Sequence, residues 1–175
     1  TICSATATVQ DSFVSSLANT TYQWTGNVLH NSLTGYLLSG ATDTIPSHVI
    51  SNPTALVDTV VYSIIPSAEL CQGPVQTLMI DVNPSPITNF DLTHQYICNN
   101  SLNSAIHLSS TTPNVSYTWS MISHDSIIIG SFPITGNSDS IPVASANVIN
   151  TDTIPHAIIF NAYATTNGAA NCNGP

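Results

Sequence analysis

Lysine and arginine are both absent from this chain, which carries nine acidic residues, six histidines and a formal net charge of −9 over 175 residues. Proteins bind the phosphate backbones of nucleic acids through cationic side chains that displace counterions. Cationic side chains are also attracted to anionic lipid surfaces. We therefore expect neither a nucleic acid nor an anionic membrane surface as a partner. Long apolar runs are missing too. No stretch approaches the roughly 18 apolar residues of a spanning helix, so we expect no direct membrane insertion.

The motifs of known catalytic sites are also missing. The segment His124-Asp125-Ser126 has the residue types of a hydrolase triad, but neighbours on a strand point to opposite faces and cannot form the relay. No nucleophile elbow, zinc-protease helix or phosphate-binding glycine loop occurs. We expect no catalytic residue, no metal site and no cofactor. Structural calcium stays open, although no Asp-x-Asp cluster supports it.

What the chain does have is apolar residues, at 42%, and four cysteines, which occur without a Cys-x-x-Cys motif. We expect a folded protein with disulfides Cys3–Cys71 and Cys98–Cys172. These bonds close loops of 68 (71 − 3) and 74 (172 − 98) residues, which the chain-entropy model values at about 4 kcal/mol each. Disulfides persist in oxidising compartments. Since the chain begins at Thr1 without an initiator Met, we expect a mature, exported fragment.

The same string of short motifs occurs twice. The first copy has Cys3, Tyr22-Gln23-Trp24, Ile45-Pro46 and Cys71-Gln72-Gly73-Pro74, and the second has Cys98, Tyr117-Thr118-Trp119, Ile141-Pro142 and Cys172-Asn173-Gly174-Pro175. The separation grows from 95 residues at the first cysteine (98 − 3) to 101 at the last (172 − 71), so the extra residues lie late in the unit. A period this long suits a complete domain, and the sequence predicts two copies of one module.

Short runs of β-branched and aromatic residues between Gly, Pro, Asn and Asp predict an all-β fold of two tandem immunoglobulin-like β-sandwich domains. The expected strands are 6–9, 21–25, 35–38, 60–65 and 76–82, then 106–109, 116–120, 126–129 and 157–162. We expect domains at 1–84 and 85–175, joined by a stiff linker that contains Pro84 and Pro86. By comparison of the copies, the first domain lacks its first strand and the second lacks its last.

Each copy carries a tyrosine and a tryptophan two residues apart, which places both side chains on one face of a strand. We expect Tyr22, Trp24, Tyr117 and Trp119 to be core aromatics. The alternative is an exposed platform on which sugars stack.

Five of the eight aspartates are followed by Ser or Thr and then Ile or Val. One explanation is turn chemistry, in which Asp caps a turn before a strand. The other is that the pattern resembles the O-glycosylation acceptor of exported Bacteroidetes proteins. The sugar-bearing residues would then be Thr44, Thr59, Ser126, Ser140 and Thr153.

The order of motifs resembles the PKD-like, immunoglobulin-like repeats of giant Bacteroidetes surface proteins, which include gliding-motility adhesins and other cargo of the type IX secretion system. The resemblance rests on Cys, Tyr-x-Trp, Asp-x-Ile-Pro, the strand Val60 to Pro66, Cys71-Gln72-Gly73-Pro74 and Val82-Asn83-Pro84-Ser85-Pro86. The second copy departs from it with Asn161-Ala162-Tyr163 in place of the end of the Val60 strand. The resemblance implies an extracellular, cell-surface location.

We therefore expect a structural or adhesive repeat segment of a long secreted adhesin or filament, which acts as a stalk. Its expected partners are neighbouring repeats of the same chain, with surface polysaccharide or other surface proteins as further candidates. The alternatives are a polymerising pilin-type subunit completed by a donated strand and a carbohydrate-binding module.

Overall fold

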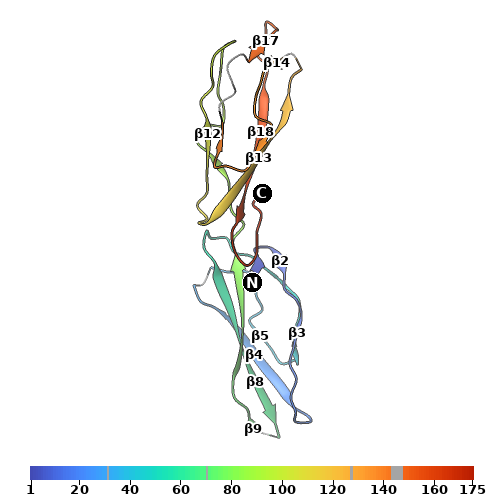
Figure 1. Cartoon of the computed structure of the whole chain (residues 1–175). Helices are drawn as coiled ribbons and strands as arrows, with labels where there is room; N and C mark the ends of the chain where they lie inside the picture. Colours follow the sequence, from blue (N-terminus) through green and yellow to red (C-terminus); the bar gives the residue numbers. More distant parts are fainter. Residues whose placement is uncertain (31, 70, 127, 143–147) are drawn as a thin grey trace. The chain divides into compact units, whose positions relative to one another are not determined.

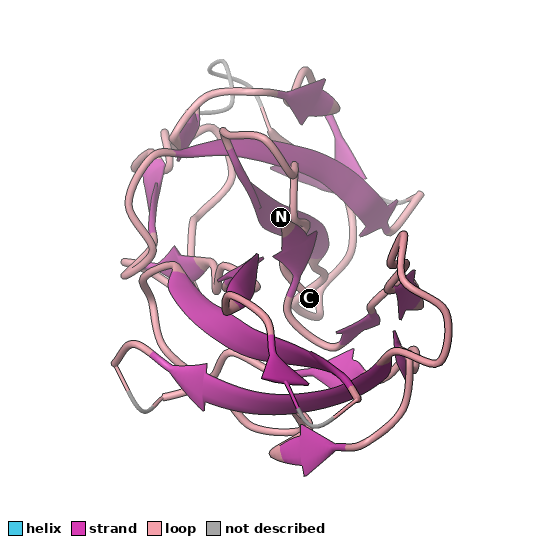
Figure 2. Ribbon diagram, turned by 90° about the horizontal axis from the view of Figure 1, so that it is seen from below, coloured by secondary structure: helices cyan, strands magenta, loops and turns pink. Residues whose placement is uncertain are grey.

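The computed structural model describes residues 1–30, 32–69, 71–126, 128–142 and 148–175. Two compact units form, one from Thr1–Ser85 with Gly168–Cys172 and the other from Pro86–Asn167 with Asn173–Pro175. Figure 1 labels several strands of each unit, and Figure 2 shows strands and loops without a helix in the part of the chain that is described. The protein is all-β, and its paired sheets fit an immunoglobulin-like sandwich.

The N-terminal unit is built on one large sheet. Its strands, in order across the sheet, are β1 (Ile2–Cys3), β10 (Gln76–Asn83), β8 (Asp58–Ala68), β4 (Thr21–Val28) and β5 (Ser39–Gly40), with β9 (Cys71–Gln72) paired to the end of β8. The β1–β10 pair is parallel and the others are antiparallel. Two short pairs complete the unit, namely β2 (Thr6–Ala7) with β7 (Val49–Ile50) and β3 (Asp11–Ser12) with β6 (Thr44–Ile45).

Alternation along β4 and β8 forms the core of this unit. Tyr22, Trp24 and Gly26 of β4 are buried, while the residues between them are exposed. Tyr62 of β8 is fully buried, and its ring meets that of Trp24 edge to face at 5.9 Å. Ile45 and Ile50 of the short pairs belong to the same cluster. The core therefore lies between the large sheet and the short pairs.

The described residues of the C-terminal unit form three small sheets. They are β15 (Thr135–Gly136), β13 (Val115–His124) and β18 (Ile158–Thr166); β11 (Asn89–Phe90), β12 (Ile106–Ser109) and β16 (Ser140–Ile141); and β14 (Ile128–Ile129) with β17 (Ile149–Asn150). A bulge interrupts the β13–β18 register between Met121 and Ser123. Leu108, Trp119 and Ile141 form the main core cluster with Ala162.

The two sequence repeats share a strand register. Tyr22 lies opposite Pro66, and Tyr117 lies opposite Ala164. Each tryptophan also lies against a glycine, because a Cβ on Gly40 or on Gly136 would come within 2.2 Å of the facing indole. The repeated motifs therefore specify one packing arrangement twice.

Most expected strands form, and their edges differ for physical reasons. The expected strand at 35–38 is wrong: Gly35 has φ +81° and approaches the Val49 carbonyl so closely that an added Cβ would collide with it. The chain turns there, and the strand begins only at Ser39. The expected strand at 126–129 shrinks to β14, and Ile127 lies outside the described residues.

Candidate functional site

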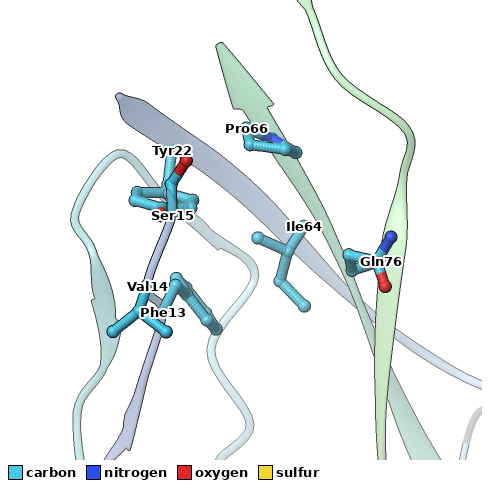
Figure 3. A pocket seen from close by; sticks show the side chains of 7 residues that line it. All are labelled: Phe13, Val14, Ser15, Tyr22, Ile64, Pro66 and Gln76. Atoms are coloured by element: carbon cyan, nitrogen blue, oxygen red, sulfur yellow. The ribbon is translucent and has the colours of Figure 1, made fainter. Parts of the chain in front are cut away.

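A pocket of about 230 Å³ opens beside the core of the N-terminal unit. It is lined by Phe13, Val14, Ser15, Tyr22, Ile64, Pro66 and Gln76. Figure 3 shows Phe13 and Val14 on one side and Gln76 on the other, with Ile64 between them. Val14 is 93% exposed, which is costly for a large aliphatic side chain. The pocket is therefore mostly apolar and borders an exposed edge, and the pocket itself was not predicted from the sequence.

The strand register identifies the residues of the C-terminal unit that correspond to the pocket edge of the N-terminal unit. The β12–β16 pair matches the β3–β6 pair, since Ile106 faces Ile141 just as Asp11 faces Ile45. Leu108 and Ser109 thus correspond to Phe13 and Val14. In the C-terminal unit, β11 pairs with Leu108 and Ser109, and Phe90 of β11 packs against the core cluster. Within the described residues, no strand pairs with the equivalent edge at Phe13 and Val14.

In the C-terminal unit a different strand edge lacks a full partner, namely the side of β18 that does not pair with β13. In the N-terminal unit, β10 covers β8 along seven residue pairs, from Gln76–Ile64 to Val82–Asp58. The matching strand β18 pairs with β13 on one side. On its other side, the described part of the chain places only the bridge between Thr165 and Asn173. In the parts of the two units that are described, β11 thus covers an edge that is uncovered in the N-terminal unit, and β10 covers an edge that is largely uncovered in the C-terminal unit.

The cysteine pairing predicted from the sequence is wrong. Cys3 is bonded to Cys172, with a Cα–Cα distance of 5.5 Å, and Cys71 and Cys98 are free and exposed. The bond holds the segment Gly168–Cys172 against β1, within the N-terminal unit.

Strand direction explains the error. Cys3 pairs with Asn83, next to the beginning of β8, whereas Cys71 follows the other end of β8 and pairs with Ala68. A strand of 11 residues rises about 3.3 Å per residue, so some 35 Å separates the two ends. A disulfide spans a Cα–Cα distance below about 7 Å. A bond between Cys3 and Cys71 is therefore impossible in this sandwich.

The four expected core aromatics lie in the two cores. Trp24 and Trp119 are 4% and 3% exposed. Tyr22 is buried with Trp24, and Tyr117 is half-buried against the cluster that contains Trp119. Neither tryptophan offers a face on which a sugar could stack, so these residues do not support a carbohydrate platform.

The five candidate glycan acceptors fall into three settings. Ser126 and Thr153 are exposed, Thr44 and Ser140 are half-buried, and Thr59 is buried. The Thr59 hydroxyl donates to Asp81 at 2.8 Å, so a sugar on Thr59 does not fit the folded unit. Thr44 and Ser140 precede the buried Ile45 and Ile141 in matching strands. At these two places the pattern also serves strand formation.

Contacts of two histidines, His30 and His156, with aspartates were not anticipated. His30 lies 3.0 Å from the buried Asp58, and His156 lies between two carboxylates, 2.8 Å from Asp125 and 3.1 Å from Asp152. The side-chain contacts with Asp152 and Asp125 raise the pKa of His156. The two carboxylates bind opposite ring nitrogens, so they do not converge on one point. In the described residues, no group of His, Cys, Asp or Glu side chains is arranged to hold a metal ion.

Asp58 should make the N-terminal unit sensitive to acid. Burial raises the pKa of Asp58, but hydrogen bonds from the Ser32 hydroxyl, the Thr59 amide and His30 outweigh it and hold the pKa at about 2. The folded pKa is thus depressed, so this stabilisation is present above the ordinary Asp value of about 3.9 and is lost as the pH falls through about 2. Replacing Asp58 with Asn should cost about 1.5–3 kcal/mol at pH 7. Urea unfolding should show this deficit shrinking at low pH, while Asp43→Asn, at an exposed position, serves as the control. A deficit that does not change with pH would contradict this assignment.

The fold and its edges define an immunoglobulin-like sandwich module. Residues 1–86 match the family model of the PKD-like domain, which supports an immunoglobulin-like, PKD-like repeat in the N-terminal unit. No curated protein and no solved structure matches the chain. PKD-like domains are typically extracellular repeat modules, and the Cys3–Cys172 disulfide fits an oxidising environment. Where the structure describes the chain, it contains no helix of the length and apolarity that a membrane crossing requires.

Proposed function

We propose that this chain is a structural segment of a long secreted adhesin or filament, in which it acts as an extracellular stalk. The proposal is best supported by the two complementary open edges. Among the described residues, β11 covers an edge whose counterpart at Phe13 and Val14 has no paired strand, and β10 covers an edge whose counterpart on β18 has only the Thr165–Asn173 bridge. Repeats placed in series would complete each other, because each would receive an extended strand beside the neighbouring repeat.

The further attributes of this role follow the sequence resemblance. The long protein would belong to the giant Bacteroidetes surface proteins of the gliding-motility type and would be exported by the type IX system. Exposed Ser126 and Thr153 are the acceptors best placed to carry glycans. Neighbouring repeats are the proposed partners, and the protein has no catalytic role.

A pilin-type subunit is the second candidate, and the pocket beside Phe13 and Val14 favours it. A neighbouring subunit could pair a donated strand with this edge and insert an apolar side chain into the pocket, as Phe90 does against Leu108 within the chain. In this case the native protein would be little longer than the 18.4 kDa chain.

Antibodies against this chain would test both candidates on the cells that make it. A stalk segment should be labelled on intact cells. After boiling in reductant, it should run as one polypeptide several times larger than 18.4 kDa. A surface polymer that collapses to a band near 18.4 kDa would favour the pilin. Labelling that requires permeabilised cells would contradict both.

A further inference from the structure

The two free thiols occupy positions that correspond to the two bonded ones. After Cys3, Ala5 has φ 60° and its amide donates to the Ile50 carbonyl at 2.8 Å. After Cys98, Asn100 has φ 59° and its amide donates to the Val148 carbonyl at 3.1 Å. Cys98 therefore begins the second repeat in the same turn with which Cys3 begins the first.

The residue after each of these cysteines confirms the match. The Ser4 hydroxyl accepts a hydrogen bond of 2.8 Å from the Asn52 amide, and the Asn99 side-chain oxygen accepts one of 2.8 Å from the Asn150 amide. Both asparagines in turn hold the following loop, with Nδ2 donating to Leu56 and to Ile154 respectively.

Cys71 and Cys172 correspond in the same way. Gly73, two residues after Cys71, donates its amide proton to the Pro66 carbonyl at 2.8 Å. Gly174, two residues after Cys172, donates to the Ala164 carbonyl at the same distance. Since Pro66 and Ala164 face the equivalent tyrosines, Cys71 ends the first repeat as Cys172 ends the second.

The observed disulfide therefore follows a rule. It joins the cysteine that begins one repeat, Cys3, to the cysteine that ends the next repeat, Cys172. By the same relation, Cys98, which begins the second repeat, would bond to a cysteine that ends a following repeat. Cys71, which ends the first repeat, would bond to a cysteine that begins a preceding repeat. Both are exposed, as a bond to another molecule or repeat requires.

We propose that Cys98 of one copy of this two-repeat chain forms a disulfide with Cys71 of the next copy, in the same relation as Cys3 and Cys172. In a longer chain the same bond would link successive pairs of repeats. As the Sγ–Sγ bond forms, the two thiols lose two protons and two electrons. Oxidised glutathione accepts these and is converted into two molecules of reduced glutathione.

One difference between the two ends bears on this bond. Pro66 and Gly73 are 7 residues apart (73 − 66), whereas Ala164 and Gly174 are 10 apart (174 − 164), so the loop before Cys71 is three residues shorter. Cys71 lies in the exposed strand β9, which begins three positions after Ala68, the last residue of β8 (71 − 68). The proposed disulfide at Cys71 would thus form close to the end of β8, because the loop between β8 and Cys71 is the shorter of the two loops.

Two single variants of the full chain test the pairing. Cys71→Ser keeps only the Cys98 thiol free, and Cys98→Ser keeps only the Cys71 thiol free, while Cys3–Cys172 stays intact in both. Each variant, their equimolar mixture and the unmodified chain are incubated with a glutathione redox buffer and examined on non-reducing gels. Peptide mapping then identifies the bonded cysteines. A double variant without either free thiol is the control for non-covalent association.

The proposal predicts a covalent dimer in the mixture, formed about tenfold or more faster than in either variant alone, because a fitted contact raises the effective concentration of the correct thiol. The unmodified chain should give a ladder of multimers joined through Cys98 and Cys71. The proposal is overturned if each variant alone dimerises as fast as the mixture, if no dimer forms, or if the unmodified chain bonds Cys71 to Cys98 within one molecule. Because purified chains are used, the result does not depend on whether the protein is found on cell surfaces.

Discussion

Replacing Trp24 with alanine should destabilise the N-terminal unit by about 3–5 kcal/mol, as expected when a large aromatic side chain is removed from a closed core. Trp24 is 4% exposed, packs edge to face on Tyr62 and covers Gly40. None of these neighbours can fill the space without moving a strand. This loss is a large share of the stability of a typical domain.

Amide hydrogen exchange followed by mass spectrometry would localise the effect. Protection should fall across β4 and β8 in the Trp24 variant, and across β13 and β18 when Trp119 is replaced in the same way. Tyr96→Ala is the control, because Tyr96 is 96% exposed and its removal should change stability by no more than about 0.5 kcal/mol. Unchanged protection in β4 and β8 would contradict the core assignment of Trp24.

Breaking the Cys3–Cys172 bond should have the second large effect. The bond closes a loop of 169 residues, for which the chain-entropy model gives about 5 kcal/mol as an upper value. The loss should fall on the N-terminal unit, since the bond holds Gly168–Cys172 there. The Cys172→Ser variant should therefore melt lower by roughly 5–15 °C.

The matched control is Cys71→Ser, which removes an exposed, unbonded thiol at the corresponding place in the first repeat. Calorimetry in the absence of oxidant should find its melting temperature unchanged. If both substitutions lowered the melting temperature equally, the stabilising role of Cys172 in the N-terminal unit would be refuted. The two units make a two-state analysis unsafe, so each transition has to be fitted separately.

Most of the strands could be predicted from local amino-acid composition. The runs of Val, Ile, Thr and Tyr at 60–65 and 76–82 fall within the two long strands β8 and β10, because β-branched residues alternating with polar ones suit a half-buried sheet. The tryptophans could be placed from their repeat positions. Gly35–Leu38 could not, because its conformation depends on the contact of Gly35 with Val49, a tertiary feature.

The cysteine pairing could not be predicted from the sequence, for a different reason. Four cysteines allow three connectivities, and loop entropy alone favours none of them strongly. The choice follows from strand direction, which places Cys3 and Cys71 at opposite ends of β8. The pocket at Phe13 and Val14 was not predicted either, although the comparison of the two copies led us to expect that the first one lacks a strand at the place that β11 occupies in the second.

Mapping the disulfides of the purified monomer, which carries no bond between copies, tests the account most directly. Free thiols are alkylated first, and a protease that cuts before aspartate then separates the four cysteines, since the aspartates at 11, 58, 81, 91, 125 and 152 lie around and between them. The account predicts a single cross-linked pair, Thr1–Gln10 with Asp152–Pro175, and alkylated Cys71 and Cys98. Bonds Cys3–Cys71 and Cys98–Cys172 would contradict it, because Cys3 and Cys71 lie at opposite ends of β8 and Cys172 is the partner of Cys3.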